Sequence, residues 1–165
     1  MQHPHVAVTV NKRVQIVKKA EELAVAYRSS KYQMGGKTTE AFDCSYFVYL
    51  VFSSIFPAYT YLNSEAMISG PFKLATRPSP GDVIFFGKGQ VPYELNKKKN
   101  VQEFPNHVGI VLDSSSWVGR QSSGLGLVYF NDVWWWPRGP KFYSYEKFDS
   151  AHVSYFASDA RKGVA

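Results

Sequence analysis

Cysteine is nearly absent from this chain, since Cys44 is the single one among 165 residues. A disulfide within the chain is therefore excluded, and cysteine usage leaves the redox compartment undetermined. A lone cysteine is either a small buried hydrophobic residue or a reactive thiol, and composition alone favours the buried residue.

A recognisable leader and a long apolar run are also missing. The first ten residues show no basic segment followed by an apolar core, which argues against a cleaved signal peptide. Residues 44–62 carry no charge, but Ser53, Ser54 and Pro57 interrupt them, which indicates a buried helix and its exit rather than a membrane span. We therefore expect synthesis in the cytoplasm without membrane insertion. If the target lies outside, export must follow a route other than a cleaved signal.

Acidic residues are few, 13 against 19 basic ones, so the formal net charge is +6. Such a surface favours acidic partners, including nucleic acid, anionic lipid and anionic cell-wall polymers. The one dense basic cluster, Lys97 to Lys99, lies beside a single aromatic residue and within no nucleic-acid-binding motif, so we expect a solvated loop and no nucleic-acid partner. His3, His5 and His152 lack metal-ligand spacing, and we expect no metal and no other cofactor.

What the chain does contain suits a single folded domain over residues 1–165, with 45% hydrophobic and 16% aromatic residues. Hydrophobic periodicity predicts an edge strand at residues 6–10 and helices at 12–27, 44–56 and 63–70. Strands are expected at residues 82–86, 107–113, 117–121, 127–130 and 152–157. Helices followed by antiparallel strands indicate an α+β fold.

One pair of residues has the features of a nucleophile and its base. Asp43, Cys44 and Ser45 open an apolar helix after a glycine-containing loop. The positive end of a helix dipole favours a thiolate, and the free N–H groups there can bind an oxyanion. His107 opens a strand, which would hold its imidazole rigidly. This pattern predicts Cys44 as nucleophile and His107 as general base.

Three sequence blocks, in order, resemble the signature of the NlpC family of cell-wall peptidases. Residues 32–48 match Y-x-x-G-G followed by D-C-S-G-F-V, apart from one position; residues 80–86 are similar to P-G-D-L-v-F-F, and residues 106–111 to s-H-V-G-I-y. Each block is weak by itself, but the ordered set is specific, and the resemblance extends over roughly residues 32–129.

The resemblance implies a papain-like α+β fold in which N-terminal helices pack on a central antiparallel β-sheet. It implies cleavage of peptidoglycan stem peptides, typically between γ-D-glutamate and diaminopimelate. Carried over by position, Cys44 is the nucleophile and His107 the general base. Tyr32 would orient the thiol or the oxyanion, and Asp43 and Ser45 would bind polar groups of the substrate.

The chain departs from the family pattern at two positions. Tyr46 stands where the family has glycine after D-C-S, and its bulk is expected to reshape a pocket wall. The family usually has a second histidine in a segment like f-v-H-a-s-s-s-G, and in the matching residues 117–124 Gly119 takes its place. A glycine cannot orient an imidazole, so another residue must do so.

Strand geometry offers Gln121 as this third catalytic residue. If residues 114–116 form a three-residue loop, Asp113 pairs with Trp117, and Gln121 faces the same side as His107 as its diagonal neighbour. Its amide oxygen could then accept from the ring N–H, as a neutral orienter does in papain-like enzymes. Asp113 is a weaker alternative, because it lies at the turn.

Two further segments leave alternatives open. The three consecutive tryptophans at residues 134–136 favour hydrophobic packing over a groove for glycan or peptide. The polar insert at residues 88–105 directly precedes His107, and it predicts either a lid over the cleft or a long surface loop.

The resemblance also leaves the biological role open. A small basic hydrolase without a visible signal looks like an amidase effector that bacteria inject into rival periplasms by type VI secretion, which would be paired with a cognate immunity protein. Its site of action would be the periplasm and cell wall of the target cell. The alternatives are a housekeeping or phage cell-wall hydrolase, a thiol acyltransferase or amidase acting on a substrate outside the wall, and a non-catalytic wall-binding module.

Overall fold

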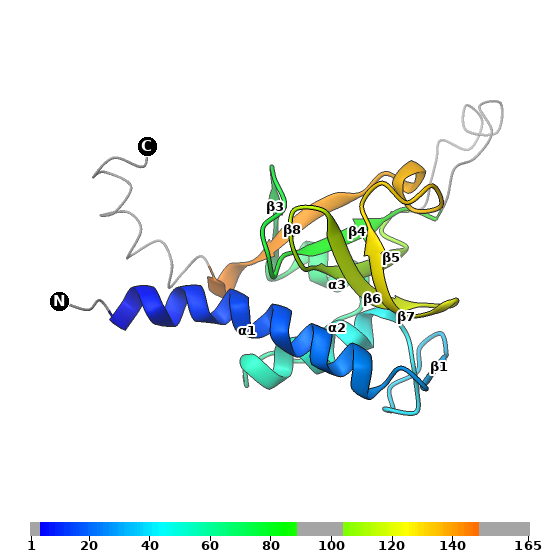
Figure 1. The fold of residues 1–165 in the computed structure, drawn as a ribbon, viewed down its shortest axis with the longest axis horizontal. Helices are drawn as coiled ribbons and strands as arrows, with labels where there is room; N and C mark the ends of the chain where they lie inside the picture. Colours follow the sequence, from blue (N-terminus) through cyan, green and yellow to red (C-terminus); the bar gives the residue numbers. More distant parts are fainter. Residues whose placement is uncertain (1–3, 89–103, 149–165) are drawn as a thin grey trace.

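Three helices lie along one side of a six-stranded sheet in the computed structural model, which describes residues 4–88 and 104–148 (Figure 1). The helices are α1 (Pro4–Ala26), α2 (Cys44–Ile55) and α3 (Ser64–Ser69). The strands of the sheet are β3 (Phe72–Ala75), β4 (Val83–Phe86), β5 (His107–Val111), β6 (Ser116–Gln121), β7 (Gly124–Tyr129) and β8 (Lys141–Tyr145). The predicted α+β class, with helices ahead of an antiparallel sheet, is confirmed.

The sheet has the order β3-β8-β4-β5-β6-β7, and all these neighbours are antiparallel. Two short strands, β1 (Lys31–Tyr32) and β2 (Ala41–Phe42), pair in parallel just before α2. Every residue of β4, β5 and β6 is buried. Such central strands need cover on both faces, and the chain supplies a different cover for each.

The helices cover one face of the sheet. The apolar stripe of α2, including Phe47, Val48 and Phe52, packs on inward residues of the strands such as Val108 and Ile110. All five side chains are fully buried, which makes this the main core and fixes α2 against β5.

A smaller aromatic cluster covers the opposite face. Trp117 is fully buried there, against Phe86 and Trp135. A Cβ atom at Gly109 would lie 2.3 Å from the Trp117 indole, so this position needs glycine for the ring to lie flat on the strand. The arrangement matters for function because His107 shares this face of the sheet with Trp117.

Long-range polar contacts join α1 to the sheet. Asp82 is fully buried, and its Oδ1 accepts hydrogen bonds from Arg13 Nη1 at 2.8 Å and Ser144 Oγ at 2.6 Å. Its Oδ2 accepts from the Ser79 N–H at 2.9 Å. The Arg13 guanidinium also lies 4.4 Å from the centroid of the Phe148 ring. One carboxylate therefore connects the first helix, the turn before β4 and the strand β8.

Several predicted elements need correction. Residues 6–10 belong to α1 and form no edge strand, since β-branched propensity is a weak preference that a continuing helix overrides. Strands β3 and β8 were not predicted from the sequence; both are short and only partly buried, so alternation along them is faint. The strand expected at residues 152–157 and most of the insert at 88–105 lie outside the described residues.

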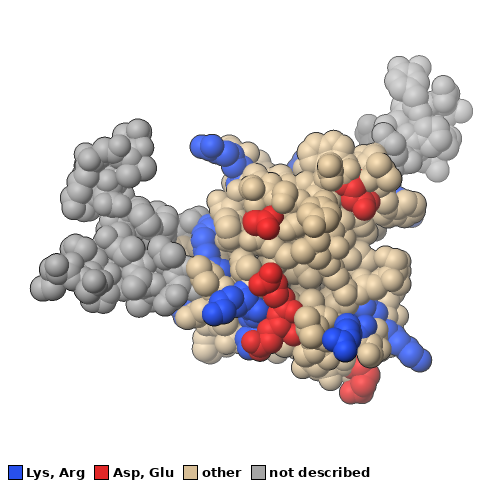
Figure 2. Space-filling view, viewed as in Figure 1, with Lys and Arg blue, Asp and Glu red and all other residues tan. Residues whose placement is uncertain are grey.

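Charged side chains on the face shown in Figure 2 form small groups of both signs around a broad uncharged area. The net charge of +6 therefore does not appear on this face as one continuous basic patch. In the described ranges 4–88 and 104–148, no helix combines the length and apolar character that crossing a membrane requires.

Candidate active site

Cys44 is the first residue of α2, and Asp43 caps this helix. Asp43 has an extended backbone, and its Oδ1 accepts a hydrogen bond from the Tyr46 N–H at 3.0 Å. Its Oδ2 accepts from the Gly35 N–H at 2.9 Å, which ties the preceding glycine loop to the helix end. Gly35 adopts a φ of 74°, a left-handed conformation that favours glycine. The cap therefore fixes both the start of the helix and the loop beside the cysteine.

The Cys44 thiol is buried where α2 meets β5. Only 9% of the residue is exposed, and the backbone N–H groups of Val108, Ser45 and Cys44 itself lie near its sulfur, where they favour the thiolate. Val108 directly follows His107, so the sulfur lies at the start of the strand that carries the histidine.

The expectation that the helix terminus lowers the thiol pKa is wrong for this state of the protein. Burial raises the pKa of Cys44 to about 11, and the nearby Asp43 carboxylate adds to the rise. The three N–H donors act in the opposite direction without overcoming burial. The thiol is therefore neutral at ordinary pH.

His107 is the first residue of β5, and its ring contacts Trp117 and Trp135; only 8% of the residue is exposed. Burial lowers its pKa to about 4, so the imidazole is neutral as well. Its Nε2 lies 3.3 Å from the Gln121 side-chain oxygen. Because an amide oxygen can only accept, this contact keeps the ring proton on Nε2 and leaves the Nδ1 lone pair available as a base.

The strand register explains why Gln121 is the partner. Strand β5 pairs with β6 through Ile110–Val118 and Val111–Trp117, two residues away from the register expected from the sequence. Counting three residues back from Ile110 and three forward from Val118 sets His107 directly opposite Gln121. A shift by two preserves the face, so the predicted contact forms although the predicted register is wrong.

The assignment of Gly119 to the position of the second histidine is not supported by this register. Gln121, two residues further along β6, occupies the place across from His107. A Cβ at Gly119 would lie 2.9 Å from the Gln121 oxygen, so a side chain there would crowd the amide out of its position. The glycine is thus part of the arrangement that lets Gln121 reach the imidazole.

Trp135 stacks on the catalytic candidate His107. The two ring centroids lie 4.6 Å apart with an angle of 28° between the planes, and Trp117 meets the same imidazole edge-on at 5.7 Å. These contacts restrict rotation of the ring and keep water from one of its faces. The sequence showed three tryptophans in a row but gave no sign of which one would meet the histidine.

The other predicted site residues occupy two different places. Tyr32 borders the open cavity beside His107, and partial burial and the nearby Cys44 raise the pKa of its hydroxyl. Asp43 and Ser45 instead lie in a buried network outside the cavity lining: Ser45 Oγ donates to Asp43 Oδ1 at 3.2 Å and accepts from the Tyr61 hydroxyl at 2.9 Å. Their hydrogen bonds hold the start of α2, and like Cys44 they are not among the residues that line the cavity; their contact with substrate stays a prediction.

Asp113, the weaker alternative to Gln121, lies away from the imidazole. Its Oδ1 accepts hydrogen bonds from the Ser115 N–H and from the hydroxyls of Ser115 and Ser116, which lowers the pKa of the carboxyl. It closes the turn between β5 and β6 and does not orient His107.

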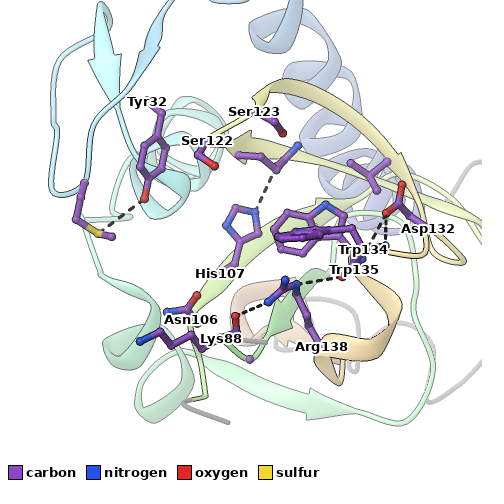
Figure 3. A pocket seen from close by; sticks show the side chains of 14 residues that line it. Tyr32, Lys88, Asn106, His107, Ser122, Ser123, Asp132, Trp134, Trp135 and Arg138 are labelled. Atoms are coloured by element: carbon purple, nitrogen blue, oxygen red, sulfur yellow. Dashed lines mark hydrogen bonds between the residues drawn. The ribbon is translucent and has the colours of Figure 1, made fainter. Parts of the chain in front are cut away.

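A cavity of about 600 Å³ opens in front of His107 (Figure 3). Tyr32 lies on one side of it, while Trp134, Trp135 and Arg138 lie across from Tyr32, with His107 between. Met34, whose sulfur is 3.8 Å from the Tyr32 hydroxyl, also lines the cavity. The cavity is large enough for a short peptide segment. Across residues 4–88 and 104–148, His, Cys, Asp and Glu side chains nowhere gather in a group of three that could hold a metal ion.

A sequence model of the NlpC/P60 family matches residues 29–139 of the chain, which includes Tyr32, Cys44, His107 and Gln121. Over 115 residues the chain is 29% identical to the probable peptidoglycan endopeptidase LytE of Bacillus subtilis (strain 168). That match covers 70% of this chain and 30% of LytE, so the chain spans less than a third of that relative's length.

Solved structures share the fold at low sequence identity. The NlpC/P60 domain of the peptidoglycan hydrolase SagA superposes with a TM-score of 0.54 at 21% identity, covering 80% of this chain and 97% of that one. A lipoprotein-like protein of the NLP/P60 family from Staphylococcus aureus gives 0.58 at 18% identity, covering 76% and 40%. RipB, a peptidoglycan hydrolase from Mycobacterium tuberculosis, gives 0.53 at 16% identity, covering 82% and 67%.

Proposed function

The chain belongs to the NlpC/P60 family, whose members are cysteine peptidases and amidases, and on this premise we propose that it hydrolyses the stem peptides of peptidoglycan. The bond we propose is the one between γ-D-glutamate and diaminopimelate. The observation that carries the proposal is the junction of α2 with β5, where the Cys44 sulfur meets the backbone beside His107 and Gln121 holds the far side of the imidazole. The relatives LytE, SagA and RipB, each described as a peptidoglycan endopeptidase or hydrolase, support the substrate class.

In the first half of the reaction, His107 Nδ1 takes the thiol proton while the Cys44 sulfur attacks the peptide carbonyl carbon. A tetrahedral intermediate with a negatively charged oxygen forms, and we propose that the N–H groups at the start of α2 stabilise it. The carbon–nitrogen bond then breaks, and the leaving amine takes the proton from the imidazolium. Gln121 stabilises the imidazolium between these two transfers by accepting from Nε2–H.

In the second half, His107 takes a proton from a water molecule, which attacks the thioester carbonyl. The carbon–sulfur bond breaks, the acid product leaves, and the proton returns to the sulfur. Because both partners are neutral at rest, with pKa values of about 11 and about 4, we propose that the thiol gives up its proton only as the sulfur attacks.

The proposal is tested by digesting purified sacculi with wild type and with Cys44→Ala, and by identifying the released fragments by mass spectrometry. Wild type should release fragments that begin with a free diaminopimelate amine, and Cys44→Ala should lose at least about 10³-fold of the rate. Fragments with a different new terminus would show that the enzyme cleaves another bond. Equal release by both proteins would exclude Cys44 as nucleophile.

An injected antibacterial role, with a cognate immunity protein as partner, stays a finer proposal that rests on the basic charge of the chain. Directing the wild-type chain to a bacterial periplasm should then lyse the cells, while Cys44→Ala directed there should not. Cells that grow normally with an active wild-type enzyme in the periplasm would favour a housekeeping or phage role.

A further inference from the structure

Arg138 lies at the same end of the sheet as His107, although 31 residues separate them in the sequence. Phe86 pairs with His107 across β4 and β5, and the next residue, Gly87, donates its N–H to the Arg138 carbonyl at 2.7 Å. Both Arg138 and His107 line the cavity described above, and Figure 3 shows Arg138 beyond His107 on the side away from Tyr32.

The Arg138 side chain is held in place before any ligand arrives. Its Nε donates to the Trp134 carbonyl at 3.0 Å, and its Nη1 donates to the Lys88 carbonyl. The guanidinium carbon lies 4.1 Å from the centroid of the Trp134 ring, on which the planar group stacks. A side chain fixed by two carbonyls and an indole loses little conformational entropy on binding a ligand.

The guanidinium nevertheless has no anionic partner among residues 4–88 and 104–148. The ion pairs found there are Arg13 with Asp82 and Lys19 with Glu22. Asp132 borders the same cavity, but its Oδ1 accepts from the N–H groups of Trp134 and Trp135 at 2.9 and 3.3 Å rather than from Arg138. The two donors in use are Nε and one Nη1 hydrogen, so Nη2 retains both of its N–H groups for a ligand.

We propose that Arg138 binds a carboxylate on the leaving-group side of the substrate, and that it makes the enzyme selective for diaminopimelate with a free side-chain carboxylate. The planar guanidinium matches the two oxygens of a carboxylate. The proposed reaction indicates where the leaving group binds. Because His107 protonates the leaving amine, the diaminopimelate half of the substrate lies toward His107 and the residues beyond it. This inference rests on the proposed function and adds that the active site recognises the side-chain carboxylate of diaminopimelate.

The test compares three synthetic tetrapeptides, L-Ala-γ-D-Glu-diaminopimelate-D-Ala, with every carboxylate free, with only the diaminopimelate side-chain carboxylate amidated, or with only the D-Glu α-carboxylate amidated. For wild type, amidation at diaminopimelate should reduce kcat/KM about 10- to 100-fold, mostly through KM, as expected for loss of one charge-assisted contact. Arg138→Gln should cut the free peptide as slowly as wild type cuts the diaminopimelate-amidated one, with less than about a twofold further effect of that amidation.

Two controls make the result specific. Arg138→Lys keeps the charge but loses the planar fork, so part of the preference should remain. Arg77→Gln changes the charge equally on the exposed loop between β3 and β4, outside the cavity lining, and it should keep the full wild-type preference. Thermal unfolding of each variant checks that its fold is intact.

Binding separates this inference from the proposed function. The dissociation constants of Cys44→Ala and of Cys44→Ala with Arg138→Gln for the same peptides, read from tryptophan fluorescence, need no turnover. Discrimination in Cys44→Ala that disappears with Arg138→Gln supports the carboxylate site even if wild type cleaves no peptide. Equal affinity for the free and diaminopimelate-amidated peptides, or no binding of either, overturns it, as does a preference confined to the D-Glu carboxylate.

Discussion

At the scale of single residues, the site is an uncharged pair in which burial outweighs every local effect that would ionise it. The helix terminus and three N–H donors favour a thiolate at Cys44, yet desolvation is the larger influence on its pKa. The same holds for His107, where the Gln121 oxygen favours the protonated ring but burial lowers the pKa further. In the proposed mechanism, reactivity thus depends on proton transfer between two groups that are neutral at rest.

Alkylation of Cys44 by iodoacetamide should be slow near about pH 7 and should accelerate toward the thiol pKa of about 11, because only the thiolate reacts. The rate is measured by mass spectrometry from about pH 6 to 11, and the absence of any other cysteine makes the signal unambiguous. A rate that already reaches its plateau below about pH 8 would contradict the neutral thiol. Slow alkylation is accordingly no evidence that Cys44 is inert.

Two substitutions of Gln121 should move the pH profile of kcat/KM in opposite directions. Wild-type activity is expected to fall on the acid side with a midpoint near the His107 pKa of about 4. Gln121→Glu places a negatively charged carboxylate beside the His107 Nε2–H and should raise this midpoint. Gln121→Leu removes the acceptor, lowers the midpoint and should reduce kcat about 10²-fold. Identical profiles in the two variants would show that Gln121 does not act through the imidazole.

At the scale of elements, the site is an intersection of one helix end and two strand ends. The cap at Asp43 fixes where α2 begins, and the turn between β5 and β6 sets the register that brings Gln121 to His107. Asp113 closes this turn through its hydrogen bonds to Ser115 and Ser116. It does not orient the imidazole itself, but it stabilises the hairpin that carries Gln121. Position along an element, more than residue type, decides which side chain meets the imidazole.

Asp43→Ala should lower the free energy of unfolding by about 2 kcal/mol and reduce activity as well. The variant loses a helix cap together with the link from that cap to the Gly35 loop, both formed by a buried carboxylate. Chemical denaturation and stem-peptide cleavage measure the two effects. Asn63→Ala removes the exposed cap of α3 and is the matched control, with a cost of about 1 kcal/mol and unchanged kcat/KM.

At the scale of the whole molecule, the carboxylate of Asp82 joins parts of the chain far from the reaction. It binds Arg13 from α1 and Ser144 from β8 at the end of β4 opposite to Phe86 and His107. The molecule therefore has an ion pair with a buried carboxylate at one end of the sheet and the proposed catalytic pair, neutral at rest, at the other. Substitutions at the two ends should separate stability from activity.

Asp82→Ala should destabilise the fold by about 3 to 5 kcal/mol, because it leaves Arg13 and Ser144 without their buried acceptor. Denaturant unfolding gives this loss, and kcat per folded molecule should stay within about twofold of wild type. A large fall in kcat with an intact fold would mean that the two ends of the sheet are coupled.

Stability should also depend on pH through His107. Its folded pKa of about 4 lies below the usual 6.5, so the unfolded chain binds more protons between these values, and stability decreases as the pH falls through this range. The full loss is about 3 kcal/mol, reached below about pH 4. Unfolding of wild type and His107→Gln across about pH 3 to 8 isolates this contribution. Parallel stability curves would contradict a neutral buried imidazole.

Sequence patterns alone predicted the class of fold and the elements that carry the two proposed catalytic residues. Local patterns were sufficient for Cys44 at a helix start, His107 at a strand start and helices ahead of a sheet, because caps, periodicity and turns are short-range effects. The face on which Gln121 lies also followed, since alternation along a strand survives a register shift of two residues.

Tertiary structure alone decided the protonation of the site and the identity of its walls. The pKa values of Cys44 and His107 depend on burial by segments distant in sequence, which local helix-terminus reasoning does not include. The stacking of Trp135 on His107 and the place of Arg138 in the cavity arise from the long connection between β7 and β8. Contacts between distant segments depend on how the elements pack, and no pattern within either segment encodes that packing.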